Sequence, residues 1–230
     1  MDEIKLEFLN PAHLADIVAL QNLVVQHLTR KDMYYQNYET IEKRLKVAQA
    51  VVGAYCDDKL VGFHVMDTPD LSGDILAAEL GWSPAELRKV VRLGPIAVHP
   101  DYRGRNIITR MVAVHLDLIR ETDYRHVIAT VSPYNYPSIK YLFSQGFRLE
   151  QITFRYHGNM TRCITHLDLG KPKTEELCRI KVAHDDLRTQ KYLLARNFYG
   201  YGLIKTAEGY DILYGCQKDD CMEPWQERQL

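Results

Sequence analysis

The sequence predicts a mixed α/β protein in which a central sheet carries helices on both faces and a C-terminal β-α-β-β extension follows. Three observations support this. Strand-like and helix-like patterns alternate along residues 1–170, two strand–turn–helix units stand in the middle of that region, and another strand, helix and hairpin are predicted within residues 171–230. We therefore expect one domain over residues 1–170 and an extension over residues 171–230 that packs on it.

The N-terminal part should contain a strand, two helices and a hairpin. Their predicted ranges are 4–8, 10–28, 39–49 and 50–67. The strand is indicated by alternating apolar and polar residues. Asn10 is a good N-cap and Pro11 suits the first helical position. Two apolar runs flank Asp57 and Asp58, which is typical of a hairpin.

The middle of the chain should continue the alternation. The residues Ser83-Pro84-Ala85-Glu86 form a capping box, which predicts a short helix running through Val91. The elements expected after it are a buried strand, a helix, a central strand, a helix closed by Gly146 and a long hairpin that turns near Gly158 and Asn159. Their ranges are 93–100, 105–123, 126–133, 136–147 and 149–169.

The extension aligns without gaps to the unit before it, at a spacing of 51 residues. The identical pairs are Val131/Val182, Lys140/Lys191, Tyr141/Tyr192, Leu142/Leu193 and Phe147/Phe198. Asn135 also corresponds to Asp186, and Gly146 to Asn197. Two interpretations are open: a structural repeat, or chance agreement between two strand–helix–strand patterns.

Composition and charge narrow the classes of partner. The chain is 46% hydrophobic and 26% charged with a net charge of −1, which is typical of a globular protein and gives no reason to expect nucleic acid or a membrane as partner. No apolar run reaches the length of a membrane span, and the N-terminus has no apolar signal core. The five cysteines are scattered and odd in number, which argues against a metal site and a disulfide framework. We expect a reducing, cytoplasmic compartment.

The stretch VHPDYRGRNIITRM, residues 98–111, is where an anion could bind. A strand that turns directly into a helix leaves backbone N–H groups unpaired at the helix start, and the helix dipole favours negative charge there. Gly104 would let a phosphate approach the backbone, and Asn106 tolerates a left-handed conformation. Six basic residues and only one acid lie between Arg88 and Arg110. The alternative is a solvated basic turn.

Two motifs resemble the core of the GNAT acyltransferase superfamily over about residues 1–170. The first family motif, V-x-P-x-x-R-G-x-G-x-G/A between a strand and a helix, is matched by Val98, Pro100, Arg103 and Gly104, with departures at Asn106 and Ile108. The second, N-x-x-A-x-x-L-Y-x-x-x-G-F, is matched by Asn135, Gly146 and Phe147, with Ser138 in place of Ala and departures at Tyr141 and Leu142.

This resemblance implies binding of acetyl-CoA as cosubstrate. The pantetheine arm would pair with the fourth strand, the pyrophosphate would lie on the loop amides, and the start of the next helix would flank the arm. The residues implied are Ile96, Ala97 and Val98 in the strand, Arg103, Gly104, Arg105, Asn106, Ile107 and Ile108 in the loop, and Asn135 and Ser138 at the next helix.

The catalytic groups are harder to identify. Glu79, in an apolar run, is a weak candidate for the base, because burial would raise its pKa. The family often uses a tyrosine acid at the position of Leu142. Tyr141 is adjacent and is a weak candidate, because one residue is about 100° around a helix. His99 is expected at the surface, and Cys163 is expected to be a buried apolar residue.

The acceptor site is expected at the tyrosine-rich loop and the last hairpin. Tyr34, Tyr35 and Tyr38 could line it or pack the loop onto the core. The resulting hypothesis is an N-acetyltransferase that transfers acetyl from acetyl-CoA to a primary amine of a small molecule or protein. The alternatives are an inactive CoA-binding regulatory module, a long-chain N-acyl synthase, and a structural α/β domain. The extension could extend the sheet, cover its edge or form the interface of a homodimer.

Overall fold

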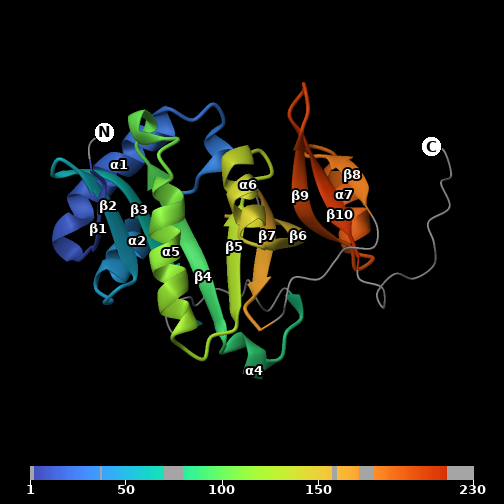
Figure 1. The fold of residues 1–230 in the computed structure, drawn as a ribbon, viewed down its shortest axis with the longest axis horizontal. Helices are drawn as coiled ribbons and strands as arrows, with labels where there is room; N and C mark the ends of the chain where they lie inside the picture. The colour runs from blue at the N-terminus through green and yellow to red at the C-terminus, as the bar shows by residue number, and fades with distance from the viewer. Residues whose placement is uncertain (1–2, 37, 70–79, 157–159, 171–178, 217–230) are drawn as a thin grey trace.

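The computed structural model describes residues 3–36, 38–69, 80–156, 160–170 and 179–216. Its strands form one ten-stranded sheet in the order β1-β2-β3-β4-β5-β7-β6-β9-β10-β8 (Figure 1). In chain order they are β1 Lys5–Phe8, β2 Val51–Cys56, β3 Lys59–Asp67, β4 Val90–Val98, β5 His126–Val131, β6 Arg148–Arg155, β7 Met160–Asp168, β8 Ile180–Ala183, β9 Tyr199–Lys205 and β10 Tyr210–Gly215. Of the pairs described, β4 and β5 alone run parallel.

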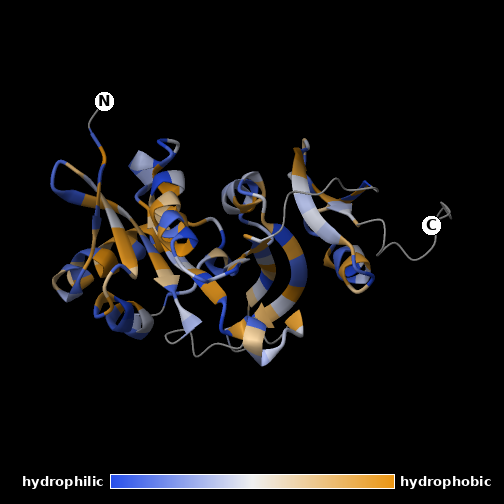
Figure 2. Cartoon of the chain, turned by 60° about the horizontal axis from the view of Figure 1, so that its bottom comes forward, coloured by the Kyte–Doolittle hydropathy of each residue, from blue (hydrophilic) through white to orange (hydrophobic). Residues whose placement is uncertain are grey.

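Helices cover both faces of the sheet, as the sequence predicts. They are α1 Leu14–Gln26, α2 Tyr38–Leu45, α4 Pro84–Leu87, α5 Ile107–Arg120, α6 Tyr136–Ser144 and α7 Leu187–Leu194. The buried side chains of α1 and α2 pack with Phe63 and Val65 of β3. On the other face α5 packs on β2, β3 and β4 through Ile107 and Met111 (Figure 1). Hydrophobic residues concentrate where these elements meet (Figure 2).

The helix predicted after Ser83 is shorter than expected, and the helix predicted over residues 39–49 also ends early, at Leu45. Ser83 does cap α4, accepting the Glu86 N–H at 3.3 Å, but the helix ends at Leu87 instead of Val91. Val90 and Val91 already belong to β4, where they pair with His126 and Val127 of β5. Two buried β-branched residues gain more from the ladder than from another helical turn. The predicted hairpin turn at residues 158–159 lies outside the described residues.

The extension repeats the unit β5-α6-β6-β7 as β8-α7-β9-β10. In each unit the last strand lies between the other two, and each pair of adjacent strands within a unit is antiparallel. Each unit has one extra residue in the strand after its helix, Glu150 in β6 and Tyr201 in β9, at the spacing of 51. Of the two interpretations that the sequence left open, the strand order and the register support the structural repeat.

The helix ends explain the aligned residues that differ. Asn135 and Asp186 are both N-caps, accepting the N–H of the residue three positions on at 3.3 and 3.1 Å. Gly146 and Asn197 both follow the helix with positive φ, 88° and 63°. Asn is the commonest non-glycine residue in that conformation. The repeat thus conserves backbone geometry where the side chains have changed.

The two repeat units are joined where β6 of the first pairs with its equivalent strand, β9, of the second. Leu149 of β6 pairs with Gly200 of β9, which is its own counterpart in the repeat. Helix α6 contacts β9 and α7 contacts β6, so each unit's helix packs on the other unit's strand. A single hydrophobic core includes Leu142, Phe147 and Leu149 together with Leu193 and Tyr214. The extension is therefore built into the core of the protein and not attached at its surface.

Cysteine usage departs from one expectation. Cys56 and Cys163 are free and buried, but Cys216, just after β10, is disulfide-bonded. The expectation of a chain without disulfides is therefore wrong for Cys216, since sequence spacing does not reveal which sulfurs meet after folding. Among the helices of the described ranges, none is long and apolar enough to cross a membrane.

Candidate active site

Strands β4 and β5 diverge at the centre of the sheet. They pair only from Val90 to Leu93 on β4. Beyond that point β4 carries Gly94 and Pro95, which bulge out of register with β3 between the pairs His64/Ile96 and Met66/Leu93. Proline has no N–H to donate, and a Cβ on Gly94 would lie 3.2 Å from the Val65 carbonyl oxygen. The Gly-Pro pair therefore ends the ladder and opens the sheet.

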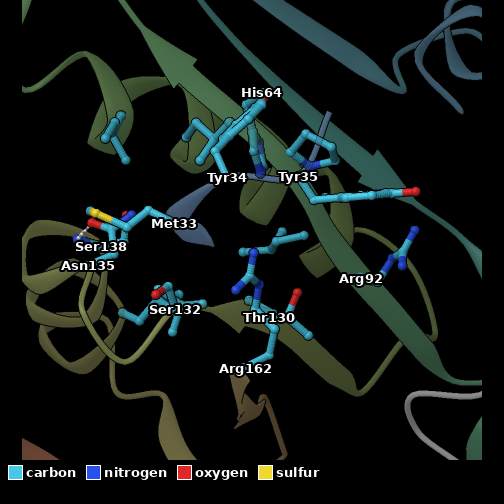
Figure 3. A pocket seen from close by; sticks show the side chains of 18 of the residues that line it. Met33, Tyr34, Tyr35, His64, Arg92, Thr130, Ser132, Asn135, Ser138 and Arg162 are labelled. Atoms are coloured by element: carbon cyan, nitrogen blue, oxygen red, sulfur yellow. Dashed lines mark hydrogen bonds between the residues drawn. The ribbon is translucent and has the colours of Figure 1, made fainter. Parts of the chain in front are cut away.

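A cavity of about 490 Å³ occupies this opening. It is lined from both diverging strands, from α5 and α6, and from the segment around the 3-10 turn Lys31–Met33 (Figure 3). The lining residues used below are Tyr34, Tyr35, Arg44, His64, Arg92, Ile96, Ile108, Asn135, Ser138, Tyr141, Leu142, Tyr156 and Arg162. None of the described lining residues is Asp or Glu.

The loop after β4 has the backbone geometry expected of an anion site. Gly104 has φ 77° with no atom within 4 Å of an added Cβ, and Asn106 has φ 57°. The left-handed Asn106 is thus confirmed. Its side chain does not cap α5, and the backbone bond from the Arg110 N–H to the Asn106 carbonyl comes only after the first turn. The N–H groups of residues 107–109 therefore point out of the helix start.

The predicted coenzyme residues fall into three groups. Ile96, Ile108, Asn135 and Ser138 line the cavity, as does the weak catalytic candidate Tyr141. Arg103, Gly104, Arg105 and Asn106 are exposed in the loop. Ala97, Val98 and Ile107 have buried side chains, so only their backbone groups could meet a ligand. Glu79 lies outside the described residues.

The basic excess around the loop is smaller than the sequence suggests. Arg92 lies in the cavity and donates from Nε to Asp67 at 2.9 Å. Arg110 donates to the Ile4 carbonyl at 2.7 Å. Arg103 and Arg105 remain at the loop, and Arg105 also lies 4.9 Å from the centre of the Tyr102 ring. The loop thus offers Arg103, Arg105 and the backbone N–H groups that begin α5 as donors.

Adjacent residues of α6 both reach the cavity. Leu142 is buried and fills the position where the family motif has tyrosine. The Tyr141 hydroxyl is buried without a hydrogen-bond partner in the described structure, and burial raises its pKa to about 12. It is a protonated donor without a partner in the described structure, on a residue that lines the cavity.

A buried pair of histidines is a feature that sequence reasoning missed. His64 lines the cavity and its Nδ1 lies 2.7 Å from Nδ1 of His115, whose Nε2 lies 3.0 Å from the Gln49 carbonyl oxygen. A carbonyl can only accept, so Nε2 of His115 carries a proton and its Nδ1 accepts from His64. Nε2 of His64 is then left with its lone pair free.

Burial sets the charge state of this pair. It lowers the pKa of His64 well below 6.5, with the nearby His115 as the second cause. It also lowers the pKa of His115 to about 4. Both rings are therefore neutral at neutral pH. A histidine within the apolar run LVGFHVMD was the available sequence signal, but only the fold brings residues 64 and 115 together.

The other sequence candidates have structural roles. Tyr34 accepts from the Gln21 amide at 2.9 Å, Tyr35 stacks on Tyr156 at 3.9 Å, and both line the cavity. Tyr38 is 41% exposed and bonds to Asn22. Tyr34 and Tyr35 thus do both things that were considered: they pack against other protein side chains and they line the cavity.

Two further candidates do not line the cavity. His99 was expected at the surface but is buried. Both ring nitrogens have partners there, since Nδ1 accepts the Asp101 N–H and Nε2 lies 3.1 Å from the Lys59 amine. Cys163 is buried as expected, and burial raises its thiol pKa to about 12. Among the described residues no group of three or more side chains could hold a metal ion.

Comparison with known proteins establishes the family. Residues 17–147 match the model of the acetyltransferase (GNAT) family. Similar solved structures include the ribosomal-protein-S18-alanine N-acetyltransferase of Escherichia coli (14% identity, TM-score 0.54), covering 75% of this chain and 98% of that one. YncA of Salmonella typhimurium, solved with its cofactor acetyl-CoA, is 16% identical with TM-score 0.53, covering 76% and 99%.

A third similar structure is the PaiA N-acetyltransferase of Thermoplasma acidophilum in complex with coenzyme A (11% identity, TM-score 0.52), covering 72% of this chain and 99% of that one. No protein with a curated function matches the sequence. The chain belongs to the GNAT acetyltransferase family, as the two motifs suggested.

Proposed function

We propose that this member of the GNAT family transfers an acetyl group from acetyl-CoA to a primary amine. The observation that carries the proposal is that the cavity in the opening between β4 and β5 reaches Ile108, two residues after the left-handed Asn106. An opened strand edge suits an extended amide chain, and an uncapped helix start suits a phosphate. Coenzyme A has both.

The coenzyme would be held mainly by backbone groups. Residues 96–98 of β4 have no partner on β5, so their edge is available to the pantetheine amides. The pyrophosphate would lie at Gly104, where an added Cβ meets no protein atom, and at the N–H groups that begin α5. Because main-chain donors do this work, Asn106 and Ile108 can replace the family's glycines.

His64 is proposed as the base. An attacking amine must lose a proton, and Nε2 of His64 is an unprotonated nitrogen on a residue that lines the cavity. His115 holds the ring in the tautomer that leaves this lone pair free. The low pKa keeps His64 available as an acceptor at neutral pH.

Tyr141 is proposed to donate a hydrogen bond to the reacting thioester. Its hydroxyl has no partner in the described structure, so bonding to a ligand would remove the cost of leaving it unpaired. This places the donor one residue before the position that the family motif uses, with Leu142 as an apolar wall.

Calorimetric titration with acetyl-CoA tests the coenzyme site. Gly104→Glu should weaken binding at least about tenfold, because it places a negative charge where the pyrophosphate would lie. Gly81→Glu is the matched control, since Gly81 has a similar φ of 74° and open space around an added Cβ. If both variants bind acetyl-CoA as tightly as the wild type does, the phosphate assignment is wrong.

Turnover tests the chemistry. His64→Asn keeps an N–H that can donate to His115 but removes Nε2, so thiol release with an amine panel should fall about 10²–10⁴-fold at an unchanged affinity for acetyl-CoA. Binding of acetyl-CoA by the wild type without thiol release across the panel would instead indicate a coenzyme-binding module without catalysis.

A further inference from the structure

Arg162 of β7 is a buried cation that lines the cavity. Only 3% of the residue is exposed, and its side chain extends from the strand into the cavity (Figure 3). It lies beside the segment around Met33 and Tyr35 and beside Tyr156, which directly follows β6. The turn at Gly104 is carried by a different part of the fold, between β4 and α5.

The contacts of Arg162 are with neutral groups. Nη1 donates to the carbonyl oxygens of Asp32 and Thr161, both at 2.8 Å, and Nη2 lies 3.1 Å from Sδ of Met160. The Tyr156 ring centre is 5.3 Å away. The Asp32 carboxylate is held by Arg30 through two bonds of 3.1 and 2.9 Å. Within the described ranges, no carboxylate forms an ion pair with Arg162.

Burying the charged guanidinium of Arg162 without an ion pair costs free energy, which an anionic ligand would offset. Burial disfavours the charged guanidinium and lowers the pKa of Arg162, yet an arginine stays protonated in proteins. A buried charge is normally paired with an opposite one. The two carbonyls fix the position of Nη1. Among the described residues, the carboxylate that acts on this charge is that of Asp32, which is itself hydrogen-bonded to Arg30. An anion that enters the cavity would give Arg162 a direct partner.

We propose that Arg162 binds the carboxylate of the acceptor, so that the acceptor is a small amino carboxylate such as an amino acid. The inference rests on the proposed acetyl transfer. An arginine fork matches a carboxylate in shape and charge. A cavity of about 490 Å³ that must also admit the acetyl end leaves room only for a small molecule. The stacked rings of Tyr35 and Tyr156 provide an apolar wall for its side chain.

The transfer balances without a further reactant. The amine nitrogen bonds to the acetyl carbon as the carbon–sulfur bond breaks, and the amine proton passes to Nε2 of His64. The sulfur leaves as a thiolate and takes up one proton, which gives free coenzyme A. The carboxylate takes no part in these bond changes. Its role is to place the amine.

The first test is direct binding without coenzyme. The wild type is titrated by calorimetry with amino acids and with their carboxamides, which keep the amine and the side chain but lose the negative charge. At least one amino acid should bind about 100-fold more tightly than its amide. Arg162→Met, which is close in length and removes a buried charge, should abolish that preference. Arg196→Met, at an exposed arginine that also lies over a tyrosine ring, should keep it.

The second test is turnover with acetyl-CoA and the same pairs. Preference for the acid over the amide in kcat/KM should fall from about 100-fold in the wild type to about equality in Arg162→Met. Bound acetyl-CoA with equal use of acids and amides would overturn the carboxylate site and leave the proposed function standing. Amino acids that bind through Arg162 while acetyl-CoA does not bind would support the site and refute the transfer.

The carboxylate that binds Arg162 could instead belong to the acyl group of the donor thioester. If malonyl-CoA or succinyl-CoA binds more tightly than acetyl-CoA, and Arg162→Met removes that difference, then Arg162 serves the acyl group. That result would overturn the assignment to the acceptor. Equal binding of the three thioesters by the wild type and the variant supports it.

Discussion

Mild acid should destabilise the fold through the buried histidine pair. An imidazole whose pKa is lower in the folded state than in the unfolded state takes up its proton first in the unfolded chain. Stability is then complete above the unfolded pKa of about 6.5 and is lost as pH falls toward the folded pKa. For His115 the folded pKa is about 4, so the loss occurs between about pH 6.5 and about pH 4.

The size of the effect follows from those two values. The full difference between 6.5 and about 4 corresponds to about 3 kcal/mol at 1.36 kcal/mol per pH unit. Between about pH 7 and about pH 5, His115 alone should cost about 2 kcal/mol of unfolding free energy. His64 acts in the same direction, because burial also lowers its pKa.

Urea denaturation at the two pH values measures this loss. His115→Gln removes the titration and keeps an amide that can donate to the Gln49 carbonyl. The variant should therefore lose about 2 kcal/mol less than the wild type does on acidification. His27→Gln, at an exposed imidazole, should lose as much as the wild type. Equal losses in the wild type and His115→Gln would refute the reasoning.

Three further predictions concern the extension. The Tyr210 hydroxyl donates to the Pro133 carbonyl, in the loop that carries Asn135. Tyr210→Phe should therefore raise the KM for acetyl-CoA several-fold with little change in kcat. Steady-state kinetics with an unchanged KM would contradict this. A Cβ on Gly200 would lie 3.0 Å from Ile212 and 3.1 Å from Leu149, so Gly200→Val should cost about 1–3 kcal/mol in denaturant unfolding. Gly202→Val is the control, because there the nearest atom is the end of the flexible Leu213 side chain. Deleting residues 171–230 should expose the shared core and lower solubility and thermal stability, and a truncated protein as soluble and stable as the whole chain would argue against it.

Sequence patterns predict the local features of this fold well. The caps at Asn10 and Ser83 and the left-handed residues at Asn106 and Gly146 depend on a few neighbouring residues, and each lies where its pattern indicates. The repeat could be found from the sequence for the same reason, since its spacing of 51 preserves capping and turn positions. The helix predicted through Val91 fails where a strand partner far along the chain competes with a local preference.

The groups that bear on chemistry could not be predicted in this way. The contact of His64 with His115 joins residues 51 positions apart, and that of Arg162 with Asp32 joins residues 130 positions apart. β3 is buried along nearly all of its length, so its hydropathy does not indicate which side chains face the cavity. The pattern alone cannot distinguish a histidine aimed at a ligand from one buried in the core.

The repeat also explains why a second unit of the same form need not bring a second coenzyme site. The opening in the first unit arises because β5 diverges from a neighbour, β4. Its counterpart β8 is the last strand of the described sheet and has no such neighbour at its outer edge. The cap that is Asn135 in the first unit, where it would flank the pantetheine arm, is Asp186 in the second.

What the second unit contributes is support for the first. Its His184 and Tyr210 rings stack at 4.3 Å, and Tyr210 contacts both the Tyr136 ring and the Pro133 carbonyl. On the other side of this loop Arg30 lies 3.6 Å from the centre of the Tyr134 ring. The β5–α6 loop is thus held between the extension and the segment that also positions Arg162. Because the extension contacts the β5–α6 loop, which carries Asn135, a substitution in the extension should change the affinity for the coenzyme more than it changes the rate of the chemical step.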